Sequence, residues 1–329
     1  MKIRIAINGF GRIGRAFTRL IFSNENFEIV AINDLASPKV LSHLLKYDSI
    51  HGVFSENISH NENSIIINDF HIPVFQTNNS SSLPWDKLRV DVVIESSGKN
   101  LTYDKAISHI HSGAKKVILT APPKTNDIKM IVMGVNHDIL DGSELIISNA
   151  SCTTNCAAPM IKILDDFCGI EKSYVTTVHS YTTDQNLHDS PHDDLRRARS
   201  APASIIPTTT GAAKALSLIF PKLNIGGCGI RVPVSNGSLT DITCVTNRSV
   251  SSSEINEKFM FSSKNGFKNI LSYTNEPIVS VDIISNSHSC IFDSQLTYSF
   301  ENLVKIVGWY DNEYGYSSRL IDLINEIFN

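Results

Sequence analysis

The sequence predicts an α/β protein in which a doubly wound domain precedes an α+β domain with a mostly antiparallel sheet. Strand-like apolar runs alternate with helix-like runs through residues 3–147. The turn between the first strand and the first helix contains Gly9, Gly11 and Gly14. Strand-like runs dominate from Ser238 onward, which is typical of an antiparallel sheet. These three observations carry the prediction.

The bulk composition is that of an ordinary globular chain. The 329 residues are 42% hydrophobic and 19% charged, with a formal net charge of −4. A negative charge offers no basic field for a nucleic-acid backbone, so we expect no nucleic-acid binding. The six cysteines contain no C-x-x-C pair, which predicts no structural metal. No apolar run is long enough to span a bilayer and no signal segment opens the chain, so we expect no membrane association and a reducing cytoplasm.

A glycine-rich turn follows the first predicted strand, residues 3–7. It reads Gly9-Phe10-Gly11-Arg12-Ile13-Gly14, and residues 15–22 continue as an amphipathic helix. A second strand over 27–32 ends at Asp34, about 20 residues past the last glycine, as in dinucleotide-binding turns. Glycines let a backbone approach a pyrophosphate, and the aspartate takes ribose hydroxyls. An aspartate here also repels a 2′-phosphate, which favours NAD over NADP. The pattern predicts a Rossmann-type NAD site.

Further strands extend this first sheet. Residues 64–67 and 71–75 are predicted to pair antiparallel, whereas 90–95, 115–120, 131–133 and 145–147 continue the alternation, with a helix over 102–111. Ligands bind at the carboxyl ends of such strands. Ser96, Ser97 and Thr120 lie at these ends and are candidates to line the nicotinamide pocket.

Cys152 lies between a strand that ends near Ile147 and a helix-like run over 157–164. Its neighbours, such as Ser151 and Thr153, are of the kind that cap helices. A helix N-terminus favours the thiolate, which is the nucleophilic form of cysteine. We therefore interpret Cys152 as a nucleophile.

The second half offers a base and several anion-binding groups. His179 ends a strand over 175–178, but spacing alone does not bring it to Cys152. Arg197 lies in a basic cluster, Thr210 and Gly211 begin a helix, and Arg231 lies on a strand. Arginines, hydroxyls and a glycine-led helix start are typical of phosphate sites, although their spacing does not show that they converge.

Strands are then predicted over 238–245, 278–284, 290–293 and 304–309, with one helix over 253–261. We expect an NAD-binding domain over 1–149, a catalytic domain over 150–313, and a C-terminal helix over 314–329 that packs back on the first domain.

The motifs together resemble phosphorylating glyceraldehyde-3-phosphate dehydrogenases along the whole chain. The matching segments are 6–15, 46–49, 179–182, 195–199, 208–213, 309–316 and, most specifically, Ser-Asn-Ala-Ser-Cys-Thr-Thr-Asn-Cys at 148–156. The resemblance implies oxidation of glyceraldehyde 3-phosphate with NAD and inorganic phosphate to 1,3-bisphosphoglycerate, in glycolysis or gluconeogenesis. It also implies a cytoplasmic homotetramer in which residues 180–204 form a loop at a subunit contact.

The resemblance also implies residue roles. Cys152 forms a thiohemiacetal and then a thioester, and His179 polarises the thiol and acts as base. The implied ligands of the substrate phosphate are Thr182 and Arg231, and those of the attacking phosphate are Ser151, Thr153, Arg197, Thr210 and Gly211. The implied NAD contacts are Arg12, Ile13, Asp34, Thr120, Asn312 and Tyr316.

Three alternatives remain at this point. Erythrose-4-phosphate dehydrogenases share the cysteine and the histidine, but Thr182 and the Thr210–Gly211 pair favour the glyceraldehyde enzyme. A semialdehyde dehydrogenase has similar cysteine chemistry and does not match residues 148–156. A non-catalytic binding protein would not need Cys152, His179 and both sets of anion ligands.

Overall fold

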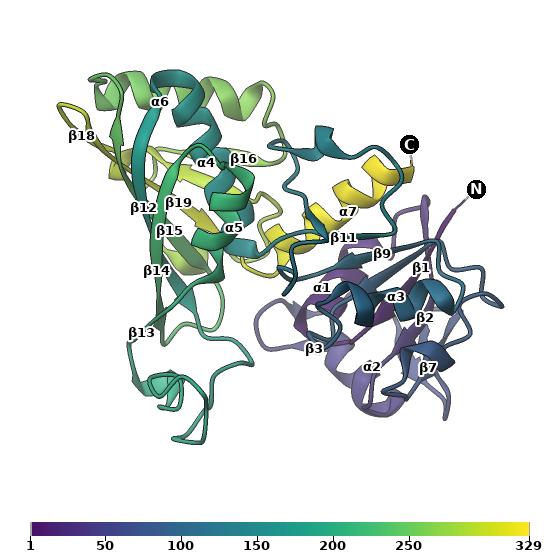
Figure 1. The fold of residues 1–329 in the computed structure, drawn as a ribbon. Coiled ribbons are helices and arrows are strands. Elements are labelled where there is room, and N and C mark those ends of the chain that lie inside the picture. The colour runs from purple at the N-terminus through teal and green to yellow at the C-terminus, as the bar shows by residue number, and fades with distance from the viewer. Residues whose placement is uncertain (1, 329) are drawn as a thin grey trace. The chain divides into compact units, whose positions relative to one another are not determined.

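The computed structural model describes residues 2–328, so Met1 and Asn329 of the predicted domains lie outside the described residues. The chain forms two compact units (Figure 1). The first contains the chain up to Ile131, residues 138–150 and the chain from Ser317 onward. The second contains residues 132–137 and 151–316. Each unit has its own sheet, which confirms the predicted fold class.

The first unit is built on a nine-stranded sheet in the order β10-β11-β9-β8-β1-β2-β7-β6-β5. The pairs from β10 to β7 are parallel, and β7-β6-β5 are antiparallel, as predicted for 64–67 and 71–75. The strands are β1 (Ile3–Asn8), β2 (Phe27–Asn33), β5 (Ile58–His60), β6 (Ser64–Ile67), β7 (Phe70–Phe75), β8 (Val92–Glu95), β9 (Lys116–Leu119), β10 (Lys129–Met130) and β11 (Ile146–Ser148). A separate hairpin pairs β3 (Tyr47–Asp48) with β4 (Gly52–Val53).

Helices α1 (Arg12–Ile21), α2 (Pro38–Lys46) and α3 (Tyr103–His111) belong to this unit, and 3-10 turns lie at Ser80–Ser82 and His137–Ile139. The central strands are apolar runs buried on both faces, as parallel strands between helices must be. In the sheet, β2 is the neighbour of β1 on one side and β8 is its neighbour on the other side. The carboxyl ends of β1 and β8 therefore flank the switch point at which such sheets bind ligands.

The second unit has a sheet in the order β13-β14-β12-β15-β19-β17-β16, with β18 paired to β19. Its strands are β12 (Ile170–Ser180), β13 (Ile206–Thr208), β14 (Asn224–Val232), β15 (Ser238–Thr246), β16 (Leu271–Thr274), β17 (Cys290–Asp293), β18 (Tyr298–Phe300) and β19 (Leu303–Tyr310). Most pairs are antiparallel, and β12·β14 and β16·β17 are parallel.

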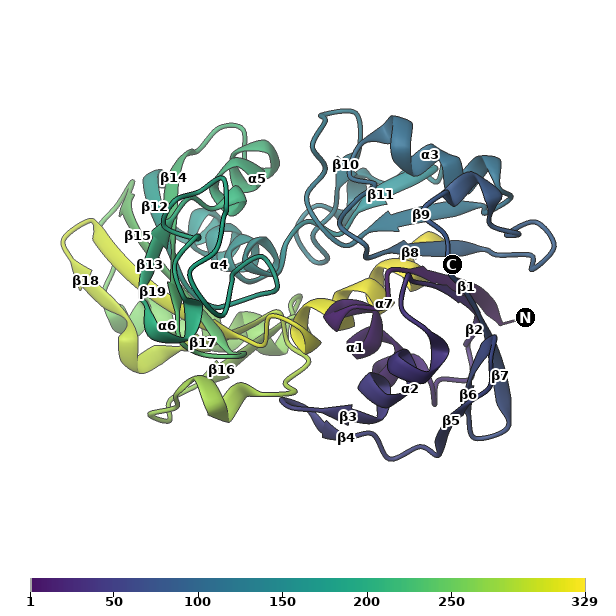
Figure 2. The ribbon, with the colours of Figure 1, turned by 90° about the horizontal axis from the view of Figure 1, so that it is seen from below.

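Helices α4 (Cys152–Cys168), α5 (Gly211–Ile219) and α6 (Ser252–Lys264) lie on one face of this sheet, as Figures 1 and 2 show. The inward residues of β12 alternate with outward ones, so Val175, Thr177 and His179 are buried toward α4. Phe259 of α6 stacks on Phe292 of β17 with ring centroids 3.9 Å apart. Shorter 3-10 turns lie at Ala201–Ala203, Ser280–Ile283 and Ser294–Leu296, and α7 (Tyr314–Phe328) closes the chain.

Two predicted strands are wrong. The strand expected over 131–133 is a turn, because the side chain of Asn136 accepts the N–H of Val132 and the short strand β10 ends at Met130. The strand expected over 278–284 is a 3-10 turn, because Asp282 accepts the N–H of Val279 at 2.7 Å. Val279 and Val281 are exposed, so this apolar run does not form a buried sheet face.

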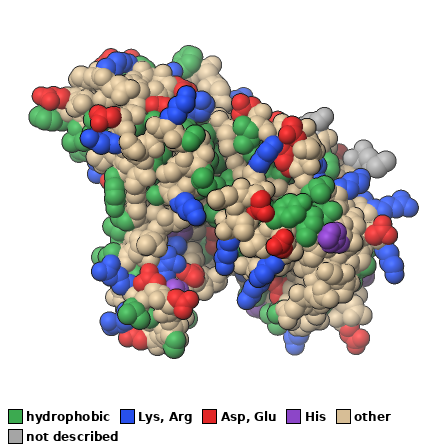
Figure 3. Space-filling view, in the orientation of Figure 1, with side chains coloured by type: hydrophobic (Ala, Val, Ile, Leu, Met, Phe, Trp, Pro, Cys, Tyr) green, Lys and Arg blue, Asp and Glu red, His purple; other side chains and the backbone are tan. Residues whose placement is uncertain are grey.

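The surface has no face of one charge in the view of Figure 3, where basic and acidic side chains are interspersed. Within residues 2–328, no helix combines the length and apolarity needed to cross a bilayer.

Candidate active site

Cys152 is the first residue of α4, so its sulfur lies at a helix N-terminus as predicted. The turn into the helix places Ala150 at a φ of 55°, a left-handed conformation that is rare for a residue with a side chain. Ser151 is the N-cap, and its hydroxyl oxygen accepts the N–H of Thr154 at 3.1 Å. The helix therefore begins at the cysteine because the chain turns at Ala150 and Ser151 caps the first turn of the helix.

His179 and Arg231 meet because their strands pair in register. β12 and β14 are parallel neighbours, and His179 is the register partner of Arg231, so both side chains lie on one sheet face. Nη1 of Arg231 lies 2.9 Å from Nδ1 of His179 and 3.0 Å from the carbonyl oxygen of Ser180.

Nε2 of His179 lies 3.4 Å from Sγ of Cys152, which is within hydrogen-bond range for sulfur. Nδ1 of His179 lies 2.7 Å from the carbonyl oxygen of Ser180, which can only accept. Nη1 of Arg231, which can only donate, also lies 2.9 Å from Nδ1, but the carbonyl oxygen is the nearer partner of Nδ1 and Arg231 reaches the same oxygen at 3.0 Å. We therefore assign the proton to Nδ1, which donates to the carbonyl of Ser180, while Arg231 donates to that carbonyl as well. The lone pair of Nε2 is left facing Cys152, so the imidazole is oriented to take the thiol proton.

The resting pair is neutral. Burial raises the pKa of Cys152 to about 11, although the charge of Arg231 and a hydrogen bond from the backbone of Thr153 act in the opposite direction. Burial and then the charge of Arg231 lower the pKa of His179 to about 3, with a smaller effect from Arg197. The helix terminus at Cys152 was expected to favour the thiolate, but desolvation outweighs it in this structure. The sulfur consequently needs a base to become nucleophilic.

Tyr310 is a buried member of this site that sequence reasoning missed. Its ring packs edge-on against His179 with centroids 5.9 Å apart. The hydroxyl of Thr177 donates its proton to the carbonyl of Leu239 at 3.3 Å, so toward Tyr310 it can only accept. The Tyr310 hydroxyl therefore donates to Thr177 at 2.9 Å and accepts from the hydroxyl of Thr153 at 2.8 Å. Tyr310 thereby joins α4 to β12. The sequence placed it just after a predicted strand and inside the matching segment 309–316, and neither signal specifies a role.

The remaining anion-site candidates of this unit lie on two segments. Arg197 pairs with Asp184, donates to the hydroxyl of Thr208 at 3.0 Å and donates to the carbonyl of Thr209 at 3.2 Å. Thr210 is the N-cap of α5, and Gly211, its first residue, faces open space. Thr182 is half-buried, and its N–H donates to Gln185. The charges of Arg231 and Arg197 both lower the pKa of His179. Thr153 is only 4% exposed, and its hydroxyl is hydrogen-bonded to Tyr310.

The glycine turn of the first unit fits a dinucleotide pyrophosphate. A side chain at Gly9 would lie 2.5 Å from the backbone of Ser97, and one at Gly14 would lie 2.5 Å from the carbonyl of Gly9. At Gly11, the N-cap of α1, space is open and no side chain caps the helix. Asp34 accepts the N–H of Phe10 at 2.7 Å, which fixes its carboxylate beside the turn. An uncapped helix start beside an oriented carboxylate suits a pyrophosphate with its ribose.

The other predicted cofactor residues divide between the units. In the first, Arg12 forms a bidentate pair with Asp48, at 2.6 and 3.1 Å, and Ile13 is half-buried beside it. Burial raises the pKa of Asp48, but hydrogen bonds from the His51 backbone and from Arg12 outweigh that effect and lower this pKa to about 2.

Ser97 and Thr120 of the first unit both bond to Glu95, Ser97 to its side chain and Thr120 to its carbonyl. Asn312 and Tyr316 belong to the second unit and are buried. Oδ1 of Asn312 accepts the hydroxyl of Ser180 at 3.0 Å.

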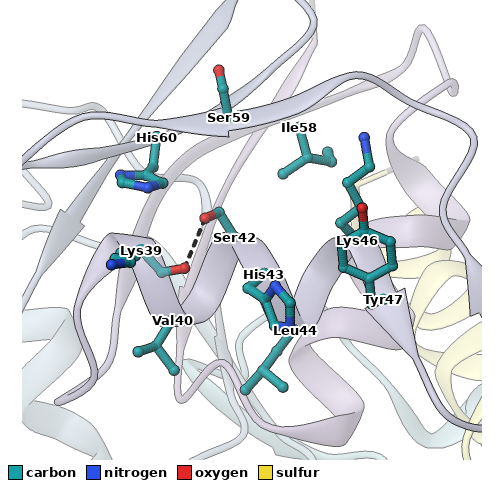
Figure 4. Close-up of a pocket in the computed structure, with 10 residues that line it drawn as sticks. All are labelled: Lys39, Val40, Ser42, His43, Leu44, Lys46, Tyr47, Ile58, Ser59 and His60. Atoms are coloured by element: carbon teal, nitrogen blue, oxygen red, sulfur yellow. Dashed lines mark hydrogen bonds between the residues drawn. The ribbon is translucent and has the colours of Figure 1, made fainter.

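A groove with a cavity volume of about 500 Å³ lies between α2 and β5 (Figure 4). Its ionisable lining groups are Lys39, His43, Lys46, Tyr47 and His60, and none of the predicted site residues lines it. Across residues 2–328, no cluster of histidine, cysteine and acidic side chains could hold a metal ion.

Comparison with known proteins gives one consistent result. Residues 3–103 match the family model "Glyceraldehyde 3-phosphate dehydrogenase, NAD binding domain", and residues 151–312 match the corresponding C-terminal domain. The chain is 48% identical over 331 residues to glyceraldehyde-3-phosphate dehydrogenase 2 of Bacillus subtilis, covering 99% of this chain and 97% of that protein. It is 49% identical over 328 residues to glyceraldehyde-3-phosphate dehydrogenase 2 of Streptomyces avermitilis, covering 98% of both.

Proposed function

Because the chain belongs to the glyceraldehyde-3-phosphate dehydrogenase family, we propose that Cys152 is its nucleophile and His179 its general base. The enzyme is an NAD-dependent oxidoreductase that converts glyceraldehyde 3-phosphate and inorganic phosphate to 1,3-bisphosphoglycerate, a step of glycolysis. The observation that carries the assignment of roles is the 3.4 Å approach of Nε2 of His179 to Sγ of Cys152.

The first step follows from the neutral resting pair. As the sulfur adds to the aldehyde carbon, Nε2 of His179 takes the thiol proton and returns it to the new oxygen, which gives a thiohemiacetal. Bound NAD supplies the hydride acceptor for the oxidation. His179 takes the hydroxyl proton while the hydride leaves, and a thioester of Cys152 results. Phosphate then attacks the thioester carbon, and the departing sulfur recovers its proton from His179.

Two anions must be held near one carbon, so their repulsion needs separate cationic sites. We assign Thr182 and Arg231 to the phosphate of the substrate. The attacking phosphate is assigned to the remaining anion-site candidates, which are Ser151, Thr153, Arg197, Thr210 and Gly211. The joint action of Arg197 and Arg231 on His179 supports this division. Open space at Gly211, at the start of α5, also supports it. Thr153 would have to release Tyr310 before its hydroxyl could donate to phosphate.

We assign NAD to the switch point of the first sheet. Gly9, Gly11 and Gly14, with Arg12 and Ile13, would take the pyrophosphate, and Asp34 would take the adenosine ribose. Ser97, Thr120, Asn312 and Tyr316 are assigned to the nicotinamide end. We accordingly assign 1–149 to NAD binding and 150–313 to catalysis, with helix 314–329 returning to the first domain.

Assembly as a homotetramer in the cytoplasm completes the proposal. Exposed apolar side chains support subunit contacts: Leu187 and Leu195 on the 180–204 loop, and Tyr298 and Phe300 on β18. The six cysteines are free, which suits a reducing compartment. Sedimentation should give four times the 36.3 kDa mass of one chain, and a monomeric mass would contradict the assembly.

The test of the residue roles is NADH absorbance with glyceraldehyde 3-phosphate. Wild type should reduce NAD only with phosphate present, and Cys152→Ser should lose this activity, whereas Cys156→Ser, a buried cysteine on the same helix, should keep it. Equal rates for wild type and Cys152→Ser would reject the role of Cys152. Erythrose 4-phosphate, run in parallel, should be the poorer substrate.

A further inference from the structure

Three polar residues end three neighbouring strands of the first unit. Asn8 of β1 is the register partner of Asn33 on β2 and of Glu95 on β8, so their side chains share one face at the carboxyl edge of the sheet. All three are at most 6% exposed. The mechanism above uses none of them, although they lie directly below the switch point.

The backbone of Thr77 fixes the direction of the hydrogen bonds on one side. Asn33 donates to the Thr77 carbonyl at 3.0 Å and accepts the Thr77 N–H at 3.1 Å, which settles which end of its amide is nitrogen. The same nitrogen donates to Oδ1 of Asn8 at 2.6 Å. The amide nitrogen of Asn8 must therefore donate to Oε2 of Glu95, also at 2.6 Å.

Trp85 fixes the direction on the other side. Its indole N–H can only donate, and it lies 3.0 Å from Nδ1 of His109. Nδ1 of His109 is therefore an acceptor, and Nε2 carries the proton that is donated to Oε2 of Glu95 at 3.0 Å. The imidazole of His109 therefore accepts from Trp85 and donates to Glu95.

The loop after β8 completes the shell. Asn100 donates to Oε2 of Glu95 at 2.9 Å, and Oε1 accepts the backbone N–H of Ser97 at 2.9 Å and its hydroxyl at 2.5 Å. Within residues 2–328, each side-chain partner of Glu95 thus donates to it. Burial raises the pKa of Glu95, but hydrogen bonds from His109, Ser97 and Asn100 bring it below its usual value, so the group is a buried carboxylate.

We propose that Glu95 is a positioning residue for the dinucleotide. Its hydrogen bonds to Ser97 and Asn100 hold the 97–100 loop against the glycine turn. Through Asn8 and Asn33 it also connects that loop to the end of β2, which Asp34 follows. The backbone of Ser97 packs against Gly9 so closely that a side chain there would lie 2.5 Å away. The hydroxyl of Ser96 donates to the Gly9 carbonyl at 2.6 Å. A displaced loop would therefore displace the turn, and with it the N–H of Phe10 that orients Asp34.

This inference rests on the proposed placement of NAD. Glu95→Gln keeps the shape but removes the charge, and it turns an amide NH₂ toward an N–H donor whichever way the amide faces: the backbone N–H of Ser97 on one side, or the side-chain nitrogens of Asn8, Asn100 and His109 on the other. Loss of hydrogen bonds to a charged group predicts that the Kd for NAD, measured by calorimetry, rises about 10- to 100-fold. The KM for NAD should rise in step. The KM for the aldehyde and kcat at saturating NAD should stay within about twofold of wild type.

Two controls separate positioning from folding. Ile67→Ala empties a buried site opposite Phe70, where β7 begins, at the other edge of the sheet from the carboxyl ends of β1, β2 and β8. It should lower Tm without changing the Kd for NAD. Asn100→Ala removes one donor from a half-buried loop residue and should weaken NAD binding about 3- to 10-fold. If Glu95→Gln does not fold, Asn100→Ala decides the question, and an unchanged Kd overturns the proposal.

Asp34→Ala separates the positioning role of Glu95 from the placement of NAD. A weaker NAD complex in Asp34→Ala with unchanged binding in Glu95→Gln would reject the positioning role alone. Unchanged binding in both variants would reject the cofactor placement itself, and with it this inference.

Discussion

His179→Gln should make the protein more resistant to acid than the wild type. Burial and the charge of Arg231 lower the pKa of His179 from 6.5 to about 3 in the folded state. Below pH 6.5 the unfolded chain therefore binds a proton that the folded chain refuses, and stability falls as the pH falls toward 3. Each pH unit in that window costs about 1.4 kcal/mol, so the wild type should lose about 2–3 kcal/mol between pH 6.5 and 4.5 from this group.

The glutamine variant lacks the titrating group but keeps an amide able to donate to the carbonyl of Ser180. Its free energy of unfolding should therefore fall less between pH 7 and 4.5, by that same 2–3 kcal/mol, as measured by urea denaturation at a series of pH values. His71→Gln, at an exposed position on β7, should keep the acid dependence of the wild type. All other groups titrate in each protein, so the difference isolates His179.

Nuclear magnetic resonance gives an independent check. In protein labelled at the histidine Cε1 carbon, the resonance missing from His179→Gln should stay at its neutral position from pH 8 to pH 5. Titration of that resonance near pH 6.5, or parallel unfolding curves for the wild type and His179→Gln, would refute the account of desolvation at this site.

Three further predictions concern the same site. Phosphate should raise the pKa of His179, because an anion beside Arg231 offsets a charge that lowers it; the shift would be seen in the labelled histidine spectrum, and no change on adding phosphate would count against an anion at that position. The rate of Cys152 alkylation by iodoacetamide should climb up to about pH 11, and Arg231→Gln should move that rise to higher pH, since Arg231 is the main group that lowers the thiol pKa; an unmoved profile would contradict this. Tyr310→Phe should lower the free energy of unfolding by about 1–3 kcal/mol, because two buried threonine hydroxyls lose their shared partner; a loss well below that range in denaturant melts would show that the threonines find other partners.

Local features were readable from the sequence because their causes are local. The turn from Gly9 to Gly14 needs glycines for close backbone approach, and the structure shows that approach at both of these residues. Ser151 and Cys152 were placed at a helix start because capping is a short-range property, and α4 begins at Cys152. The strand expected over 278–284 is absent because the N–H of Val279 donates to the Asp282 side chain and the chain turns there, which an apolar run does not reveal.

By itself, the sequence determined the fold class, the glycine turn with Asp34, and a cysteine at a helix terminus. Only the tertiary structure decided that His179 meets Cys152, because that contact depends on helix α4 packing over the end of β12. The pairing of β12 with β14 likewise brought Arg231 to the histidine across 52 residues of chain. The protonation states were also decided there, since desolvation depends on what surrounds a group in space and not on its neighbours along the chain.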